Sequence, residues 1–118
     1  MSADYWSWRD RLAEANDPRF WPIEAIDAML IAGTAQFWCD GKAALVTKIT
    51  EYPGGAQALE AVAGAGVMDS LTQKIATDVD AWARDQGLSH LMIAGRAGWL
   101  RVHKGWRHYQ TILLKDLT

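Results

Sequence analysis

The sequence has little of what would indicate a secreted protein, a metal site or a membrane span. Its single cysteine, Cys39, can form neither an intramolecular disulfide nor a pair of zinc ligands, and next to Phe37 and Trp38 we expect a buried, inert thiol. The longest uncharged stretch, residues 28–39, is well short of the roughly 20 residues that cross a bilayer. The first residues contain no basic stretch followed by an apolar run, so we expect a cytoplasmic protein without a secretory signal.

Positive charge is scarce over the first 87 residues, which hold 7 Lys and Arg side chains against 13 Asp and Glu. Residues 88–118 reverse the balance with 5 basic side chains and 1 acidic, so a net charge of −6 is followed by one of +4. Because the total is only −2, we do not expect nonspecific binding to duplex nucleic acid. The histidines His90, His103 and His108 have no two-ligand spacing on one helix face, so we expect no metal site.

The composition that is present is typical of a folded protein. With 118 residues, 50% of them hydrophobic and 22% charged, we expect one globular domain over residues 1–118. Apolar residues three and four positions apart predict helices over residues 4–15, 22–32 and 68–86. Ser70 and Gln73 form a capping-box pattern at the start of the long helix, and a glycine follows each of the last two helices.

Runs with β-branched and aromatic residues predict the strands. Asp40 and Gly41 separate two such runs and predict a hairpin in which they form a tight primed turn, with a positive φ at Gly41. A short helix is predicted over residues 95–104, and strands are predicted over residues 34–39, 42–50, 57–63, 88–94 and 106–114. The predicted fold class is α/β (α+β), with a mostly antiparallel, twisted sheet, one long central helix and two short N-terminal helices.

The end of the chain carries a family resemblance. Residues 91–106 read LMIAGRAGWLRVHKGW, in which glycine, arginine and tryptophan recur at short intervals before a Gly-Trp pair. This pattern, with the order of elements over about residues 20–118, resembles the GNAT (Gcn5-related N-acetyltransferase) fold. It is most similar to small GNAT-like proteins of tailed bacteriophages and prophages. The resemblance implies a GNAT-like domain that acts in the cytoplasm of a bacterial host or in a virus particle.

The resemblance also implies an acyl-CoA site just before the long helix. In this family, backbone N–H groups of a glycine loop bind the pyrophosphate, and Gly64, Gly66 and Val67 hold that position here. The loop contains no basic residue, and Asp69 places a negative charge where phosphates would bind. The alternative interpretation is an ordinary turn before a capped helix.

Two functions stay open because the implied catalytic group is also missing. The tyrosine that often serves as general acid in this family would lie near Arg101, which leaves His103 and Tyr109 as candidate substitutes. One function is a phage or prophage protein without a cofactor that acts by binding, as a virion component, an assembly factor or a modulator of a host protein. The alternative is an N-acetyltransferase that uses acetyl-CoA as its cofactor.

A basic and aromatic cluster near the C-terminus is the predicted contact surface for a protein partner. Arginine and tryptophan are favoured at the centres of protein interfaces, and duplex nucleic acid or a membrane is not expected here. In the alternative interpretation, the arginines pair with acidic residues of the same chain and the tryptophans are core residues. The cluster consists of Arg96, Trp99, Arg101, Lys104, Trp106 and Arg107.

Overall fold

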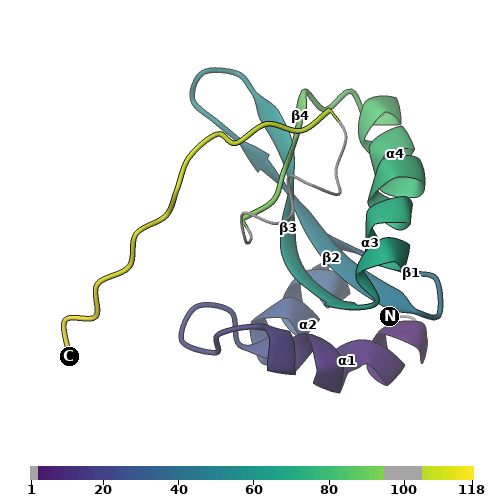
Figure 1. Cartoon of the computed structure of the whole chain (residues 1–118), viewed down its shortest axis with the longest axis vertical. Coiled ribbons are helices and arrows are strands. Elements are labelled where there is room, and N and C mark those ends of the chain that lie inside the picture. Colours follow the sequence, from purple (N-terminus) through teal and green to yellow (C-terminus); the bar gives the residue numbers. More distant parts are fainter. Residues whose placement is uncertain (1–2, 95–104) are drawn as a thin grey trace.

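The computed structural model describes residues 3–94 and 105–118 and contains a four-stranded sheet with helices on both faces (Figure 1). The predicted mixed α+β class is confirmed. Predicted features that lie in residues 95–104, including the short helix, fall outside the described part. No helix among the described residues is long and apolar enough to cross a membrane.

Two N-terminal helices, α1 (Ala3–Ala15) and α2 (Ile23–Ala32), cover one face of the sheet. Helix α1 buries side chains three and four positions apart against β3, and α2 packs against β1. Gly33 ends α2 with a φ of 77°, and the N–H of Thr34 donates to the Met29 carbonyl at 2.9 Å. This is the left-handed glycine stop that the sequence predicts.

Three antiparallel strands, β1 (Ala35–Cys39), β2 (Ala43–Glu51) and β3 (Gln57–Gly66), form most of the sheet. The short β4 (His90–Met92) pairs in parallel with β3, so the strand order is β1-β2-β3-β4. Within residues 88–94, only the three residues of β4 are in a strand, fewer than the pattern predicts. Val62 is an extra residue in β3, because Val46 pairs with Ala63 and Thr47 with Ala61, and it forms a β-bulge.

The hairpin turn between β1 and β2 differs by one residue from the prediction. Cys39 pairs with Ala44, which places Gly41 and Lys42, not Asp40 and Gly41, at the centre of the turn. The Asp40 carboxylate accepts hydrogen bonds from the N–H groups of Lys42 and Ala43, each at 2.9 Å. A side chain therefore caps this turn, an arrangement that the Asp-Gly pattern alone does not distinguish. The predicted positive φ at Gly41 is confirmed at 90°.

A continuous run of helix covers the other face of the sheet and consists of α3 (Met68–Lys74), the π-helical η1 (Ile75–Val79) and α4 (Asp80–Asp85). The predicted capping box is wrong, because the helix begins at Met68 and its N-cap, Val67, makes no side-chain cap hydrogen bond. Ser70 consequently lies inside the first turn. The predicted start at residue 68 is confirmed, and the residue before it is held instead by a hydrogen bond from the Val67 N–H to the Lys42 carbonyl, in the turn before β2, at 2.9 Å.

Alternate residues of β2 build two hydrophobic cores, as the period of a strand requires. Ala44 and Val46 face α1 and α2, while Ala43 and Leu45 face α3 and α4. The first core comprises Tyr5, Trp8, Leu12, Ile26, Ala35, Ala44, Val46 and Ala63. The second core comprises Ala43, Leu45, Leu59, Leu71, Ile75, Val79 and Ala83.

Residues 106–114, which the sequence predicts as the last strand, form no strand in the structure. From residue 107 the chain is exposed, and it runs from the neighbourhood of β4 toward the loop between α1 and α2 (yellow in Figure 1). Its contact there is an exposed ion pair, Arg19 Nη1 to Asp116 Oδ1 at 3.1 Å. Residues that favour strands are present in this stretch. Among the described residues, however, no neighbouring strand forms backbone hydrogen bonds with it.

Candidate functional site

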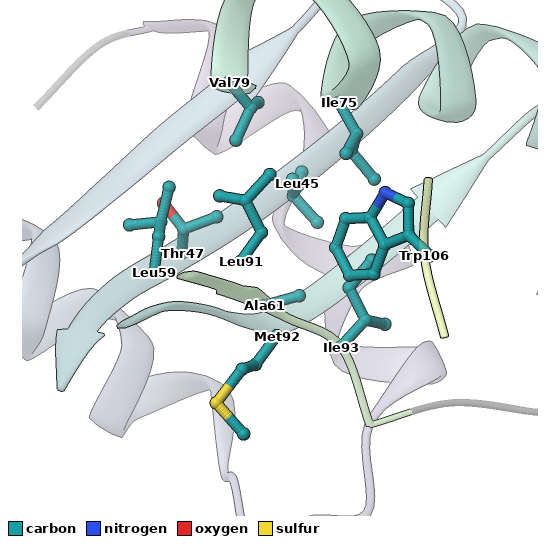
Figure 2. A pocket seen from close by; sticks show the side chains of 10 residues that line it. All are labelled: Leu45, Thr47, Leu59, Ala61, Ile75, Val79, Leu91, Met92, Ile93 and Trp106. Carbon is teal, nitrogen blue, oxygen red and sulfur yellow. The ribbon is translucent and has the colours of Figure 1, made fainter. Parts of the chain in front are cut away.

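The predicted contact surface lies only partly in the described residues. Arg96, Trp99, Arg101 and Lys104, together with the candidate acid His103, fall in residues 95–104, outside the described part. Trp106 and Arg107 are described, and they differ in their surroundings. The Trp106 ring packs against the second core beside Ile75 and Ile93 (Figure 2), whereas Arg107 is exposed.

The C-terminal segment, defined here as residues 107–118, presents large apolar side chains to solvent. Tyr109 is 68% exposed and Leu113 is 90% exposed, and three more aliphatic residues are similarly open: Ile112, Leu114 and Leu117. The Arg107 guanidinium carbon lies 6.0 Å from the centre of the Tyr109 ring, within the range of a weak cation–π contact. The candidate acid Tyr109 thus lies on an exposed segment.

The glycines of the implied acyl-CoA loop have packing reasons of their own. A Cβ atom on Gly64 would lie 3.3 Å from the Leu71 side chain, so this glycine brings α3 close to β3. Gly66 has a φ of 106°, and a Cβ there would lie 2.3 Å from the Lys42 carbonyl oxygen. Val67 is half exposed, but its N–H already donates to that same carbonyl. All three residues therefore serve the junction between β2, β3 and α3.

The space between the helix run and the sheet is almost filled. Aliphatic side chains of the second core and Trp106 line an interior cavity of about 10 Å³, about the size of one water molecule (Figure 2). A larger hollow of about 140 Å³ lies between α4 and β4. We call it the edge hollow, and its lining includes Asp80, Ala83, Arg84, Leu88 and Leu91.

The sequence analysis missed a row of neighbouring side chains that crosses three strands and contains an ion pair. Lys48, Glu60 and Met92 are register partners on β2, β3 and β4, and the Lys48 ammonium lies 3.5 Å from the Glu60 carboxylate. The Tyr52 hydroxyl donates to the other oxygen of Glu60, and this carboxylate raises the pKa of Tyr52. The only available signal was the opposite charge of Lys48 and Glu60, which becomes informative once the strand register is known.

The lone thiol is less buried than the sequence analysis expects. Cys39 is half-buried at the end of β1, packed against the first core. Burial raises the pKa of its thiol, which lowers the fraction of reactive thiolate at neutral pH. The thiol is therefore poorly suited to act as a nucleophile.

The structure was compared with known proteins. The protein TTHA1254 from Thermus thermophilus is similar with a TM-score of 0.61 at 13% identity, covering 95% of this chain and 92% of that one. A transcriptional regulator from Bacillus halodurans is similar with a TM-score of 0.64 at 15% identity, covering 99% and 95%. The chain shares the fold of both. No family model matches the sequence, and the search of curated proteins found no match.

These neighbours correct the predicted family. Neither description names an acetyltransferase or a phage protein, so the assignment to the phage and prophage GNAT-like proteins is wrong, and the virus particle as a location loses its basis. The assignment depended on the spacing of glycine and tryptophan within residues 91–106. A pattern of two residue types over so short a stretch recurs without common ancestry. At 13% and 15% identity the neighbours show the fold alone.

Proposed function

We propose that the protein acts by binding another polypeptide, with the C-terminal segment and the basic residues before it as the contact surface. The observation that carries the proposal is the exposure of Tyr109, Ile112, Leu113, Leu114 and Leu117 on one segment. Contiguous exposed apolar surface on a folded protein marks an interaction site, because its burial on binding removes it from water.

Charge supports the same surface. Residues 88–118 carry a net charge of +4 beside a body of −6, so an acidic partner is attracted to the C-terminal end of the molecule. Of the two cluster residues that the structure describes, Trp106 and Arg107, only Arg107 is exposed. Attraction between exposed charges is screened beyond about 8 Å at physiological salt, so binding should weaken as salt rises.

Photo-crosslinking in cells of the source organism tests the proposal. A benzophenone side chain in place of Ile112 should give a covalent polypeptide adduct, and the same group in place of Ile31, an equally exposed isoleucine on α2, should not. The Arg101→Glu, Lys104→Glu double variant should lower the yield, and the matched control Lys42→Glu, on the exposed hairpin turn, should leave it unchanged. Absence of an adduct at position 112, or equal adducts at 31 and 112, would overturn the proposal.

A further inference from the structure

We infer that the C-terminal segment of one copy binds as an added β-strand along β4 of a second copy, so that the partner is the same chain. The inference rests on the proposed function, because it names the partner for that contact surface. It joins two features that have no strand partner among residues 3–94 and 105–118, a strand-like segment and a sheet edge.

The donor is the first part of the C-terminal segment, residues 107–114. Its sequence, RHYQTILL, is rich in side chains that favour strands, yet none of its backbone groups hydrogen bonds to another backbone group of the described residues. Ile112 and Leu114 fall two residues apart, so in a strand they share one face. Eight extended residues span about 26 Å, which is enough to leave one body and lie along another.

The acceptor is the outer edge of β4. This strand is last in the sheet order, and among the described residues no strand pairs with its free side. An unpaired edge presents backbone N–H and C=O groups that an added strand satisfies. The edge hollow of about 140 Å³ opens beside the same strand, and its lining combines polar side chains, such as Arg84 and His90, with Leu88 and Leu91. Its volume is enough for one side chain of the added strand.

The course of the segment favours a second copy over the edge of its own chain. Trp106 anchors the start of the segment beside Ile93, and Asp116 near its end lies at Arg19 in the loop between α1 and α2. The segment thus leaves β4 and crosses to the end of the molecule that holds the N-terminal helices (Figure 1). Its own edge hollow is left for the segment of another molecule.

Charge and symmetry are consistent with reciprocal exchange. The basic Arg107 at the start of the donor would lie against a second copy whose first 87 residues carry a net charge of −6, while Asp80 at the edge hollow is already paired with Arg84. A two-fold arrangement lets each copy donate one segment and accept one, which closes the assembly as a dimer. Such a dimer does not polymerise through β4, because the β4 edge of each copy is then occupied.

Crosslinking of the purified full-length protein decides the point. Equal amounts of nitrogen-14 and nitrogen-15 protein, each with the benzophenone in place of Ile112, are mixed, allowed to exchange and irradiated. We expect a product of twice the chain mass in which position 112 of one isotope is joined to α4 or β4 of the other. The Leu114→Asp variant should lower the dimer yield at least tenfold, while Ile31→Asp, at an exposed isoleucine on α2 outside the contact surface, should leave it unchanged.

The alternative outcomes overturn the inference and separate it from the proposed function. A link between position 112 and α4 or β4 of the same chain would show intramolecular pairing, and a purified protein that stays monomeric at 100 times the working concentration would exclude the dimer. If such a protein still forms an adduct with a different polypeptide in cells, the proposed function stands and only the second copy is wrong. If no adduct forms in either setting, both are wrong. Leu114→Asp should keep the circular dichroism spectrum of the folded wild type, because loss of the dimer lowers the apparent stability without unfolding the single copy.

Discussion

Gly41 and Gly66 both adopt a positive φ, of 90° and 106°. Their surroundings differ, because a Cβ on Gly41 would meet nothing within 4 Å, whereas one on Gly66 would lie 2.6 Å from the Ala43 Cα. The first position is constrained by backbone conformation alone. The second is constrained by conformation and by the close approach of two strands and the loop between them.

Replacing Gly41 with valine should destabilise the protein by about 1 kcal/mol or more, because a β-branched residue is forced into the left-handed region. Urea unfolding measures the loss as a lower midpoint, with an unchanged slope of the unfolding free energy against urea concentration. Gly54→Val is the matched control, since Gly54 lies in an open turn without a positive φ. Equal midpoints for the Gly41 variant and the wild type would mean that the turn is described wrongly.

Gly66→Ala should cost more than Gly41→Ala, because the added methyl group also collides with the backbone of Lys42. The expected loss is about 2 kcal/mol or more against about 1 kcal/mol for Gly41→Ala. Both variants can be compared by urea unfolding under identical conditions. A smaller effect at Gly66 than at Gly41 would contradict the close contact between the loop and β2.

At the scale of elements, a partly buried group of three side chains, here called the clamp, joins α1 to α2. The Arg9 guanidinium holds the Asp27 carboxylate through Nε at 3.0 Å and Nη2 at 2.6 Å, and the buried Tyr5 hydroxyl donates to the same carboxylate at 2.6 Å. The hydrogen bonds from Arg9 hold the pKa of Asp27 below its usual value, and burial is the main cause that raises the pKa of Tyr5. The clamp fixes α1 and α2 relative to each other.

The clamp predicts a pH-dependent effect of Asp27→Asn. A carboxyl group whose pKa is lowered on folding contributes stability above its unfolded pKa of about 3.9, and this contribution disappears as the pH falls through the folded value. The difference in unfolding free energy between wild type and Asp27→Asn should therefore be present at pH 7 and shrink below about pH 4. Denaturant titrations across this range measure it. Glu24→Gln, on the exposed face of the same helix, is the control that should show little difference.

The sequence predicts elements better than their ends. Apolar spacing locates α1 and α2, and glycine stops locate Gly33 and Gly87 with their positive φ. The start of α3 at residue 68 was predicted correctly, but its capping residues and the centre of the first hairpin were not, because Lys42 contributes to both, through its carbonyl contact with Val67 and its position in the turn. These are contacts across strands, and local patterns do not contain them.

At the scale of the molecule, the candidate site was only partly predictable. The charge reversal and the apolar character of the last residues are visible in the sequence, but whether residues 106–114 pair with a neighbouring strand depends on what lies beside them. A strand needs a partner, and β-propensity alone specifies none. The edge hollow likewise arises from how α4 packs over β4, which no spacing pattern describes.

The binding role predicts that acetyl-CoA does not stabilise the protein. A ligand at 100 times its dissociation constant adds about 2.7 kcal/mol to the folded state, which for a chain of this size raises the melting temperature by roughly 10 °C. We expect no shift at millimolar acetyl-CoA in a thermal melt, because Val67 N–H, Gly64 and Gly66 are all used within the chain. A clear shift that increases when Asp69→Arg replaces the negative charge of the loop with a positive one would instead support a nucleotide site.

The sharing of β2 between two cores has a consequence for how such a chain can change length over evolution. Inserting or deleting one residue within Ala43–Val46 would send Ala44 and Val46 to the opposite side and exchange the two sets of buried side chains at once. Homologous chains should therefore keep this stretch free of gaps. Length variation is expected instead in the exposed connection around Pro53 and Gly54, where additional residues can extend into solvent without moving either core.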